Sequence, residues 1–499
     1  MSTGPFAREP FPPAVADFLR AINPWWVGGP TPQVPSYRRW AFQTVLRKMD
    51  NGLAPAVLLR GPRQVGKSIL QQQLIRYLIE ERKTEPRRIL QVQFDEIPPL
   101  ASGLGDILSI AYWFERDVLG CTFNEAARDG KPAYLFFDEA QIVPSWAPQL
   151  KALVDHHTVK AVVTGSSALR IAAGRDSLAG RVTTVELGPL LLREIAAFRF
   201  GNELKPLLPP NGLDCLLQQD FWKELQEHGL KNREVRDKAF RAFSERGGYP
   251  IAHAYPETPW PEMADQLNES VIHRAIQHDL IVAQKKRRRD RALLEEVFTL
   301  ACRYAGDTPG PSAFVPEIRR SLKMDTGWAR VLNYLDFLES ALLLKLVPPL
   351  EMRRTHHQGF DKICLCDHGL RASWLKEVIP LDDAALAVSM AQDLAGHIAE
   401  SVIGYYLSGL LHLDLGYYPA RGLDPEVDFV LAIGQWRIPL EVKYRRHIDP
   451  LRDTKGLRAF IEKPFHRAPF GILVTLCDGV AVTDPRIVPV SLPSLLLLR

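Results

Sequence analysis

Residues 61–68 combine glycines, a lysine and a hydroxyl in a spacing that can bind phosphate. The run consists of Gly61, Pro62, Arg63, Gln64, Val65, Gly66, Lys67 and Ser68. Glycines allow the backbone amides and a helix N-terminus to face phosphate oxygens, while Lys67 reaches the terminal phosphates and the Ser68 hydroxyl ligates Mg²⁺. All eight residues are therefore predicted to bind ATP with Mg²⁺, with Lys67 also acting in catalysis. A plain glycine turn between a strand and a helix is the alternative.

Two carboxylates, Asp138 and Glu139, directly follow an apolar run at 133–137. Open α/β sheets bind their ligands at the carboxyl ends of strands, which is where this pair is expected to lie. Asp138 is predicted to hold Mg²⁺ through water, and Glu139 to orient and deprotonate the attacking water. An acidic pair that merely begins a loop is the competing interpretation.

The next apolar run ends in Thr164-Gly165-Ser166-Ser167. A hydroxyl at this position, for which we choose Ser166, is placed to bond the γ-phosphate or the attacking water. Small polar residues also end strands for purely structural reasons, so the sequence leaves both interpretations open.

A second group of ionisable residues lies nearer the C-terminus. Glu400 falls in a helical stretch, Asp428 begins one predicted strand, and Glu441 and Lys443 lie on the next. Residues i and i+2 of a strand share a face, so Glu441 and Lys443 point toward a site that Asp428 can reach. Burying two charges in the apolar strand 437–446 is costly unless they pair with each other or bind an ion. An internal Glu–Lys pair therefore competes with a metal site.

This order of helix Glu, strand Asp and Glu-x-Lys resembles the PD-(D/E)XK nuclease fold. The resemblance implies that Glu400, Asp428 and Glu441 bind Mg²⁺. It also implies that Lys443, with the two strand carboxylates, activates the water that cleaves a phosphodiester. The usual Pro-Asp pair is replaced here by Val427-Asp428. Two outcomes stay open: an active metal-dependent nuclease, or a nuclease-like fold retained for binding.

Four runs of the chain resemble prokaryotic AAA+-type ATPases related to the archaeal and STAND-like NTPases, a family whose C-terminal half has no assigned function. In order, they read GPRQVGKS, FFDEAQIVPSW, VVTGSSALRI and LAGRVTTVELGPLLLREI. The resemblance covers nearly the whole chain and gives Ser166 the role called sensor 1. It also implies an arginine finger that neutralises transition-state charge, often across a subunit boundary. Arg181 is the candidate for this finger, and Arg175 is the alternative.

A further element of the resemblance is Gly248-Tyr249-Pro250. It is similar to the G-x-P element by which the lids of related ATPases touch the nucleotide, so Pro250 is predicted to bind the cofactor. A Gly-Pro turn that caps a helix explains the same residues equally well.

Alternating strands and helices must position these residues. Short apolar runs alternate with helical periods from about 37 to 195, which is typical of a parallel, doubly wound sheet. Residues 200–290 are helical in pattern, and three short helices followed by a hairpin favour a winged helix-turn-helix. The predicted fold class is α/β: a P-loop NTPase with a helical lid, a winged-helix module and a C-terminal restriction-endonuclease-like domain.

The same patterns divide the chain into six predicted regions. They are an extended N-terminal arm (1–36), an ATPase core (37–199), a helical lid (200–290), a winged helix (291–350), a linker (351–390) and a nuclease-like domain (391–499).

Composition limits the class of protein. The 499 residues are 46% hydrophobic and 24% charged, which excludes wholesale disorder and leaves room for several cores. Six cysteines without a C-x-x-C pair form neither a disulfide framework nor a zinc-site spacing. No run of about 18 apolar residues occurs, so we expect no membrane partner and a cytoplasmic location.

Electrostatics give a conditional argument for nucleic acid. The 62 Lys+Arg nearly cancel the 58 Asp+Glu, so the net charge of +4 is uninformative. Basic clusters outside the ATPase core lie at 285–289, 319–320, 353–354 and 445–447. These can neutralise backbone phosphates, and the helix at 325–340 is where a winged helix presents its recognition residues. We therefore expect DNA as a partner, although solvated faces explain any single cluster.

Two functions follow from these predictions. The first is a Mg-ATP-hydrolysing ATPase that binds and remodels DNA as a homo-oligomer, with a hexameric ring as one form and DNA cleavage as an optional activity. The second is a STAND-like nucleotide switch or scaffold whose nuclease-like domain is inactive and binds a partner. Stimulation of ATP hydrolysis by DNA distinguishes the first from the second.

Overall fold

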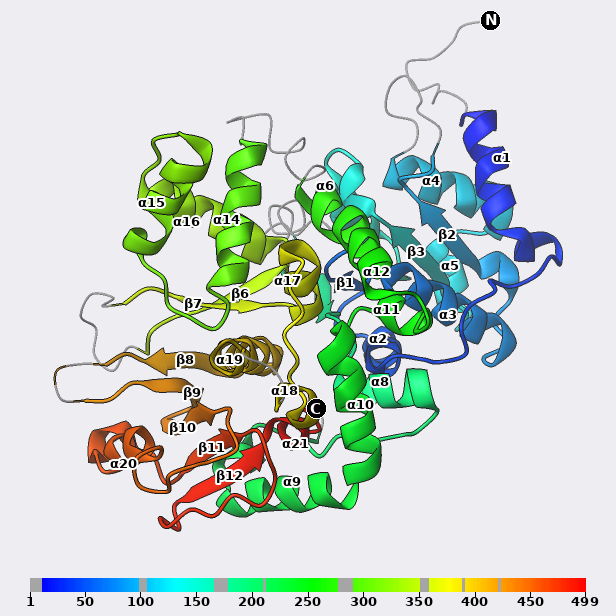
Figure 1. Ribbon diagram of the computed structural model, residues 1–499. Coiled ribbons are helices and arrows are strands. Elements are labelled where there is room, and N and C mark those ends of the chain that lie inside the picture. Colours follow the sequence, from blue (N-terminus) through cyan, green and yellow to red (C-terminus); the bar gives the residue numbers. More distant parts are fainter. Residues whose placement is uncertain are drawn as a thin grey trace, which may run out of the picture. The chain divides into compact units, whose positions relative to one another are not determined.

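A computed structural model of the chain describes residues 11–97, 106–165, 178–209, 212–276, 290–350, 359–387, 391–420, 422 and 424–499. The chain divides into two units, Met1–Leu187 and Gly188–Arg499, called here the first and second units (Figure 1). Four sequence-based assignments lie outside the described residues: Ser166, Arg175, the basic run 285–289 and the pair 353–354.

The first unit is built on a parallel sheet of five strands in the order β2-β3-β4-β1-β5. The strands are β1 (Ala56–Arg60), β2 (Ile89–Gln93), β3 (Ala133–Asp138), β4 (Val159–Gly165) and β5 (Val182–Glu186). Every residue of β3 is buried, as expected for a parallel strand covered on both faces. The carboxyl ends of all five strands meet at one edge of the sheet. The predicted parallel α/β fold is therefore confirmed for this unit.

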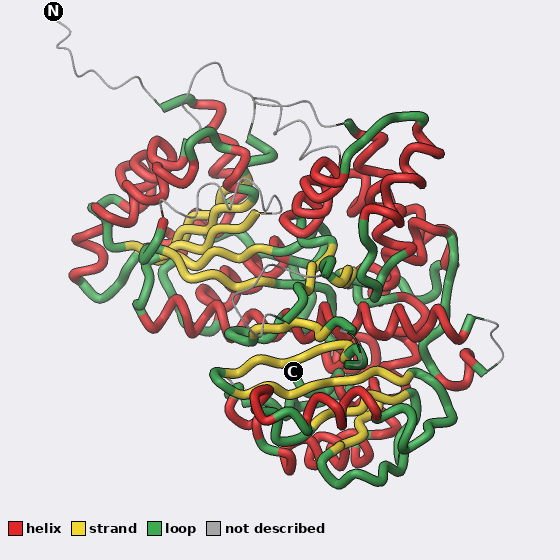
Figure 2. Tube along the Cα trace, turned by 90° about the vertical axis from the view of Figure 1, so that its left-hand side faces the viewer, coloured by secondary structure: helices red, strands yellow, loops and turns green. Residues whose placement is uncertain are grey.

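Helices surround this sheet, and Figure 2 shows them in red beside the yellow strands. The helices and helical turns are α1 (Pro13–Ile22), η1 (Pro24–Val27), α2 (Trp40–Asn51), α3 (Lys67–Glu80), η2 (Pro86–Arg88), α4 (Ile107–Phe114), η3 (Glu115–Leu119), α5 (Phe123–Arg128), η4 (Ala140–Ile142) and α6 (Trp146–His156). In α3, the buried residues Leu70, Leu74 and Leu78 recur every fourth position and form the face that packs on the sheet.

The described part of the N-terminal segment differs from the predicted extended arm, because α1 and η1 lie within it. The side-chain amide of Asn23 donates to the Gln91 carbonyl at 2.9 Å and accepts from the Gln91 amide at 2.7 Å. The indoles of Trp25 and Trp26 both donate to the Ile89 carbonyl, at 3.2 and 2.7 Å. These side chains thus form hydrogen bonds with backbone groups of β2 that no neighbouring strand pairs with, because β2 is at the edge of the sheet. The prolines around α1 hid its amphipathic pattern from the sequence analysis.

The second unit contains a mixed sheet of five strands in the order β12-β11-β10-β9-β8. The strands are β8 (Asp414–Tyr418), β9 (Val427–Ile433), β10 (Trp436–Lys443), β11 (Gly471–Thr475) and β12 (Ile487–Ser491). Neighbours from β8 to β10 are antiparallel, whereas those from β10 to β12 are parallel. The predicted mixed α/β terminal domain is confirmed at this level.

Two helices cover this mixed sheet, α19 (Gln392–Ser408) and α20 (Lys455–Ile461). Phe429 and Leu431 of β9 pack in the core that contains α19, whereas Val430 packs with Leu457 and Phe460 of α20. Successive strand residues point to opposite faces, so the two helices lie on opposite sides of the sheet.

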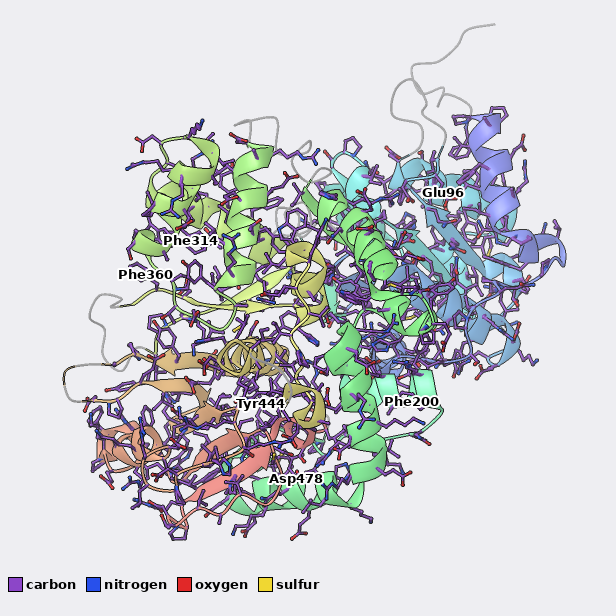
Figure 3. All side chains as sticks on the ribbon, viewed as in Figure 1. Glu96, Phe200, Phe314, Phe360, Tyr444 and Asp478 are labelled. Atoms are coloured by element: carbon purple, nitrogen blue, oxygen red, sulfur yellow. The ribbon has the colours of Figure 1, made fainter. Side chains whose placement is uncertain are left out.

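Three helices and a hairpin precede the terminal domain. They are α14 (Arg291–Arg303), α15 (Pro311–Leu322), α16 (Trp328–Ser340), β6 (Leu344–Val347) and its antiparallel partner β7 (Lys362–Leu365). Phe314 is fully buried in this module and contacts Trp328, which in turn contacts Phe360; Figure 3 labels both phenylalanines. The three helices lie in the predicted module 291–350, but the second hairpin strand, β7, lies beyond it in the segment predicted as a linker.

The segment predicted as a linker, 351–390, contains β7 and two helices, α17 (His368–Leu375) and α18 (Asp383–Leu386). All four residues of β7 are buried. Four residues are too few to show a periodic pattern, and the strand exists because β6 pairs with it. The segment is therefore folded where it is described.

The segment predicted as a lid, 200–290, is helical where it is described. Together with their neighbours, the helices and helical turns are α8 (Leu192–Phe200), η6 (Asp214–Leu217), α9 (Gln219–Lys231), α10 (Arg233–Arg246), α11 (Pro250–Ala254), α12 (Trp260–Leu267) and η7 (Asn268–His273). The chain ends in α21 (Leu492–Leu495). Buried Arg236 of α10 forms an ion pair with Asp478 at 2.6 Å and donates to Ser494 at 2.7 Å. These contacts join the lid helices to the terminal domain within the second unit.

All six cysteines are free, in agreement with the absence of a disulfide pattern in the sequence. Among the helices that the structure describes, none has both the length and the apolar character needed to cross a membrane.

Candidate functional site

The run 61–68 forms the loop between the end of β1 and the start of α3, at the carboxyl edge of the first unit's sheet. Gly66 is the N-cap of α3 and has a φ of 93°, a left-handed conformation that glycine adopts without strain. A Cβ on Gly61 would lie 2.1 Å from the Leu187 carbonyl oxygen. The backbone therefore needs glycine at both positions. In this conformation the first backbone amides of α3 are available to bind an anion.

Replacing Gly61 with alanine is expected to destabilise the first unit and to weaken ATP binding. The new methyl group must displace the Leu187 backbone, and overpacking of this kind costs about 1–3 kcal/mol. The matched control is Gly396→Ala on α19, where a Cβ meets no atom within 4 Å and alanine favours the helix. Urea unfolding and nucleotide titration measure both effects, and equal stability of the two variants would contradict the role of Gly61.

Lys67 is buried at the first position of α3, and its ammonium turns back over the loop. Its Nζ donates to the carbonyl oxygens of Gly61 at 2.9 Å and Pro62 at 2.8 Å. Burial lowers the pKa of Lys67 to about 8, while the nearby carboxylates Glu139 and Asp138 act in the opposite direction. The charged group is thus held at the loop that is predicted to bind phosphate.

Asp138 ends β3 at the same sheet edge and is almost fully buried. Burial raises the pKa of its carboxyl group, and hydrogen bonds from the Ser68 and Thr164 hydroxyls oppose that shift. The structure therefore brings Ser68 and Asp138 together, as the sequence predicted for the two oxygen ligands of Mg²⁺. Hard oxygen donors of this kind fit Mg²⁺, which keeps several waters and is completed by substrate phosphates.

Glu139 follows Asp138 in a left-handed backbone conformation with a φ of 49°. Its amide donates to the Thr164 hydroxyl at 3.2 Å, and its carboxylate accepts from the Gln141 side chain. A non-glycine residue in this region is uncommon and marks a backbone held by its surroundings. The carboxylate is partly exposed and oriented by Gln141, as a general base must be.

Two supports of this site escaped the sequence analysis. Thr164, at the end of β4, donates to the Asp138 carboxylate and accepts from the Glu139 amide, so it fixes the acidic pair. Buried Arg39, which precedes α2, donates to the Val65 carbonyl at 2.8 Å and so holds the phosphate loop from outside it. The hydroxyl residues within 164–167 indicate a role for this strand end. The residue predicted to bond the γ-phosphate or the attacking water is Ser166, which lies outside the described residues.

Arg181 lies at the amino-terminal ends of the strands, which is the end of the sheet opposite the phosphate loop. It immediately precedes β5, whose first residue pairs with Ala56 at the start of β1, whereas the phosphate loop follows the end of β1. Its guanidinium forms an ion pair with Asp155 at 2.8 Å and donates to the Ala179 carbonyl at 3.0 Å. The structure therefore does not bring Arg181 together with Lys67 of the same chain.

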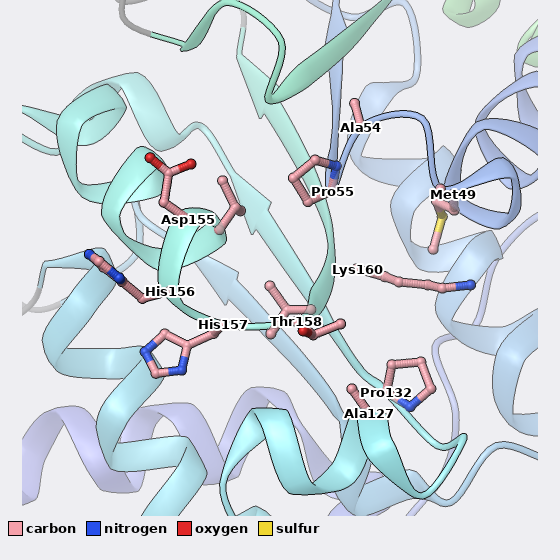
Figure 4. Close-up of a pocket in the computed structure, with 13 residues that line it drawn as sticks. Met49, Ala54, Pro55, Ala127, Pro132, Asp155, His156, His157, Thr158 and Lys160 are labelled. Carbon is pink, nitrogen blue, oxygen red and sulfur yellow. The ribbon is translucent and has the colours of Figure 1, made fainter.

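A cavity of about 420 Å³ lies at this same amino-terminal edge, and Figure 4 shows the residues that line it. Pro55 and Thr158, which precede β1 and β4, lie on its wall together with Asp155, the partner of Arg181. The cavity is therefore distinct from the phosphate loop at the carboxyl edge.

Gly248-Tyr249-Pro250 is held inside the second unit. The Gly248 amide donates to the buried Asp367 carboxylate at 2.5 Å, and Pro250 is the first residue of α11. Burial raises the pKa of Asp367 to about 7, although bonds from backbone amides lower it. The element therefore begins α11 within the second unit, and contact of Pro250 with a nucleotide stays a prediction.

The ionisable residues predicted near the C-terminus do come together. Glu400 lies on α19, Asp428 on β9, and Glu441 and Lys443 on β10. Lys443 Nζ lies 2.5 Å from Glu441 Oε1, and Asp428 Oδ2 accepts from the Val442 amide at 2.8 Å. Burial, followed by the charge of Asp428, raises the pKa of Glu441 to about 8 and that of Glu400 to about 7. The predicted cluster therefore exists as a largely buried group of charges.

Lys362, the first residue of β7, is a member of this cluster that the sequence analysis missed. It is 2% exposed, and its Nζ lies 2.7 Å from Glu400 Oε2 and 3.6 Å from Asp428 Oδ1. These carboxylates raise its pKa against the opposing effect of burial. A lysine that opens a buried apolar strand is the signal for it in the sequence, although the segment is predicted as a linker.

The carboxylates of this cluster do not fit the predicted Mg²⁺ site as they stand. In the part of the chain that is described, no three acidic, histidine or cysteine side chains are arranged to hold a metal ion. Four of the carboxylate oxygens contact Lys362, Lys443 or a backbone amide instead: Glu400 Oε2, Asp428 Oδ1, Asp428 Oδ2 and Glu441 Oε1.

Comparison with known families agrees with the fold of the first unit. Residues 54–196 match the model of an AAA domain, and residues 237–378 match a domain of unknown function, DUF8612. The AAA match contains the phosphate loop, the acidic pair and Arg181. Residues 54–196 are therefore similar to an AAA domain, in agreement with the parallel sheet and the geometry of the site.

Similar chains occur in archaea and bacteria. The uncharacterized protein MJ1637 of Methanocaldococcus jannaschii is 23% identical over 403 residues, which cover 79% of this chain and 77% of that protein. The uncharacterized protein Rv2008c of Mycobacterium tuberculosis is 27% identical over 398 residues, covering 78% and 70%. Among solved structures, the Walker-type ATPase PABY2304 of Pyrococcus abyssi has 13% identity and a TM-score of 0.36, covering 68% of this chain and 96% of that one. A TM-score this low supports no shared fold by itself.

Proposed function

We propose that this chain hydrolyses Mg-ATP. The observation that carries the proposal is the meeting of Lys67, Ser68, Asp138 and Glu139 at the carboxyl edge of one parallel sheet. Lys67 and the loop amides hold the phosphates, Ser68 and Asp138 hold the Mg²⁺, and Glu139 accepts a proton from the attacking water. Bound Mg²⁺ neutralises charge on the phosphates.

We further propose that the ATPase works as a homo-oligomer. Arg181 lies at the end of the sheet opposite its own phosphate loop, so we assign it to the nucleotide of another subunit. An arginine supplied in trans stabilises the charge of the transition state. In this assignment the Arg181 guanidinium pairs with Asp155 in the single chain. In the assembly it leaves Asp155 and pairs with a phosphate of the neighbouring subunit's nucleotide.

Duplex DNA is the partner that the second unit favours. α14, α15, α16 and the β6–β7 hairpin have the order of a winged helix-turn-helix, which binds DNA through its last helix. Exposed basic residues surround the turn between α15 and α16, namely Arg319, Arg320, Lys323 and Arg330. Arg319 and Arg320 pair with single acidic side chains at the surface, and phosphates can replace such exposed partners.

Duplex, single-stranded and branched DNA added to an ATPase assay test this proposal. We expect duplex DNA to stimulate ATP hydrolysis, with log affinity falling linearly against log salt. An ATPase that responds to no form of DNA would instead be the nucleotide switch or scaffold that the sequence also allows.

The combined change of Arg319, Arg320 and Arg330 to glutamine is expected to weaken DNA binding for all sequences. Each phosphate contact removed should reduce the slope of log affinity against log salt by about 1. The matched control is Arg116→Gln, another exposed, ion-paired arginine, which lies in the first unit. Fluorescence anisotropy across a salt series measures the slope, and an unchanged slope would remove this surface from the proposal.

A further inference from the structure

The charge cluster on α19, β9 and β10 already contains a cation. We propose that Lys362 takes the place that a divalent metal would need, so that the wild-type terminal domain binds no metal there and serves binding rather than cleavage. The proposal concerns the second unit and does not depend on ATP hydrolysis.

The first argument is the use of the carboxylate oxygens. Lys362 Nζ contacts Glu400 Oε2 and Asp428 Oδ1, while Asp428 Oδ2 accepts from the Val442 amide. Glu441 Oε1 pairs with Lys443. Glu441 Oε2 is buried without a hydrogen-bond partner, and it is the one oxygen of the cluster recorded in that state among the described residues. To gain a second ligand from the oxygens named here, a metal ion would have to displace Lys362, Lys443 or the Val442 amide.

The second argument is that Lys362 is held firmly in place. Its side chain is 2% exposed, and its Nζ lies 5.0 Å from the ring centroid of Phe429 and 6.0 Å from that of Tyr417. The backbone of Lys362 pairs with Val347 in the β6–β7 hairpin. An exposed lysine could swing aside for a metal, but this one would have to leave its buried carboxylates unpaired, which is costly.

The third argument is that Lys362 belongs to a larger contact between the hairpin module and the terminal domain. The Tyr417 hydroxyl donates to the Phe360 carbonyl at 2.7 Å, and His397 lies 3.0 Å from the Asp307 carboxylate. A Cβ on Gly306 would lie 2.0 Å from the His397 carbonyl oxygen, so the two backbones touch. The ammonium of Lys362 thus joins the winged-helix-like module to the nuclease-like sheet. A fixed contact between the two is consistent with a role in binding.

Mn²⁺ binding to the full-length, nucleotide-free protein tests the proposal, with electron paramagnetic resonance reporting free Mn²⁺. We expect no binding by the wild type at this cluster, and binding by Lys362→Met with a Kd at least about tenfold below the highest Mn²⁺ concentration at which the wild type shows none, because the carboxylates become available. Adding Glu441→Gln to that variant should abolish the gained binding. Asp138→Asn, placed in every variant, removes any contribution from the P-loop site.

Lys362→Met leaves buried carboxylates unpaired and is expected to lower the Tm by about 10 °C. Lys362→Met with Glu400→Gln removes one charge of each sign and keeps the side-chain volumes, so it should unfold closer to the wild type. This pair retains Asp428 and Glu441 and should also gain Mn²⁺ binding. Two results would overturn the proposal: wild-type Mn²⁺ binding that Asp428→Asn abolishes, or a folded double variant that gains no Mn²⁺.

Discussion

Replacing Lys67 with alanine is expected to lower the rate of ATP hydrolysis by at least about 1,000-fold. The ammonium is buried at the phosphate loop, and in its absence the charge that develops on the transferred phosphate loses a fixed donor in a water-poor site. Steady-state phosphate release measures the effect. The matched control is Lys48→Ala on α2, because Lys48 donates to Thr183 at 2.7 Å and does not contact the loop. Turnover within tenfold of the wild type would remove the assignment of the site.

The same lysine makes ATP affinity depend on pH in a defined direction. Burial lowers the pKa of Lys67 to about 8 in the free protein, and a bound triphosphate favours the charged form. Below pH 8 the ammonium is already protonated, so the Kd for ATP should be flat. Above pH 8 binding must also take up a proton, so the Kd should rise about tenfold per pH unit. Lys67→Ala should lose this dependence.

The phosphate site was predictable because its geometry is local. Gly61 permits a close backbone contact and Gly66 adopts a left-handed conformation, and both lie within the same eight residues. The strand and the helix that flank them have clear sequence patterns. Arg39 and Thr164 were missed because their partners, Val65 and the acidic pair, are distant in sequence. Only the strand order, with β4 beside both β1 and β3, brings Thr164 to Asp138.

The C-terminal cluster shows the same limit more sharply. Period-two spacing placed Glu441 and Lys443 on one face, and the order of elements placed Glu400 and Asp428 nearby. Lys362 lies on the second strand of the hairpin, which falls in the segment predicted as a linker because four residues show no period. Yet the ammonium of Lys362 determines whether the carboxylates are available to a metal ion or are paired with lysine. A pattern of acidic residues therefore predicts their proximity better than it predicts their ligand.

Glu139→Gln is expected to separate ATP binding from hydrolysis. Glutamine has the same size and keeps a carbonyl oxygen that can accept the hydrogen bond from Gln141, so the loop and the ATP affinity should stay unchanged. It cannot accept a proton from water, and removing a general base costs about 100- to 10,000-fold in rate. Calorimetric binding of ATP with single-turnover hydrolysis measures the two properties on one sample.

Two comparisons make this result specific to the general base. Glu96→Gln changes an exposed carboxylate that follows β2 at the same sheet edge, and it should leave turnover unchanged (Figure 3). Asp138→Asn removes the charge of the proposed Mg²⁺ ligand and should weaken Mg-ATP binding as well as hydrolysis. If Glu139→Gln weakens binding as much as Asp138→Asn does, Glu139 holds the cation rather than the proton, and the division of roles within the acidic pair is wrong.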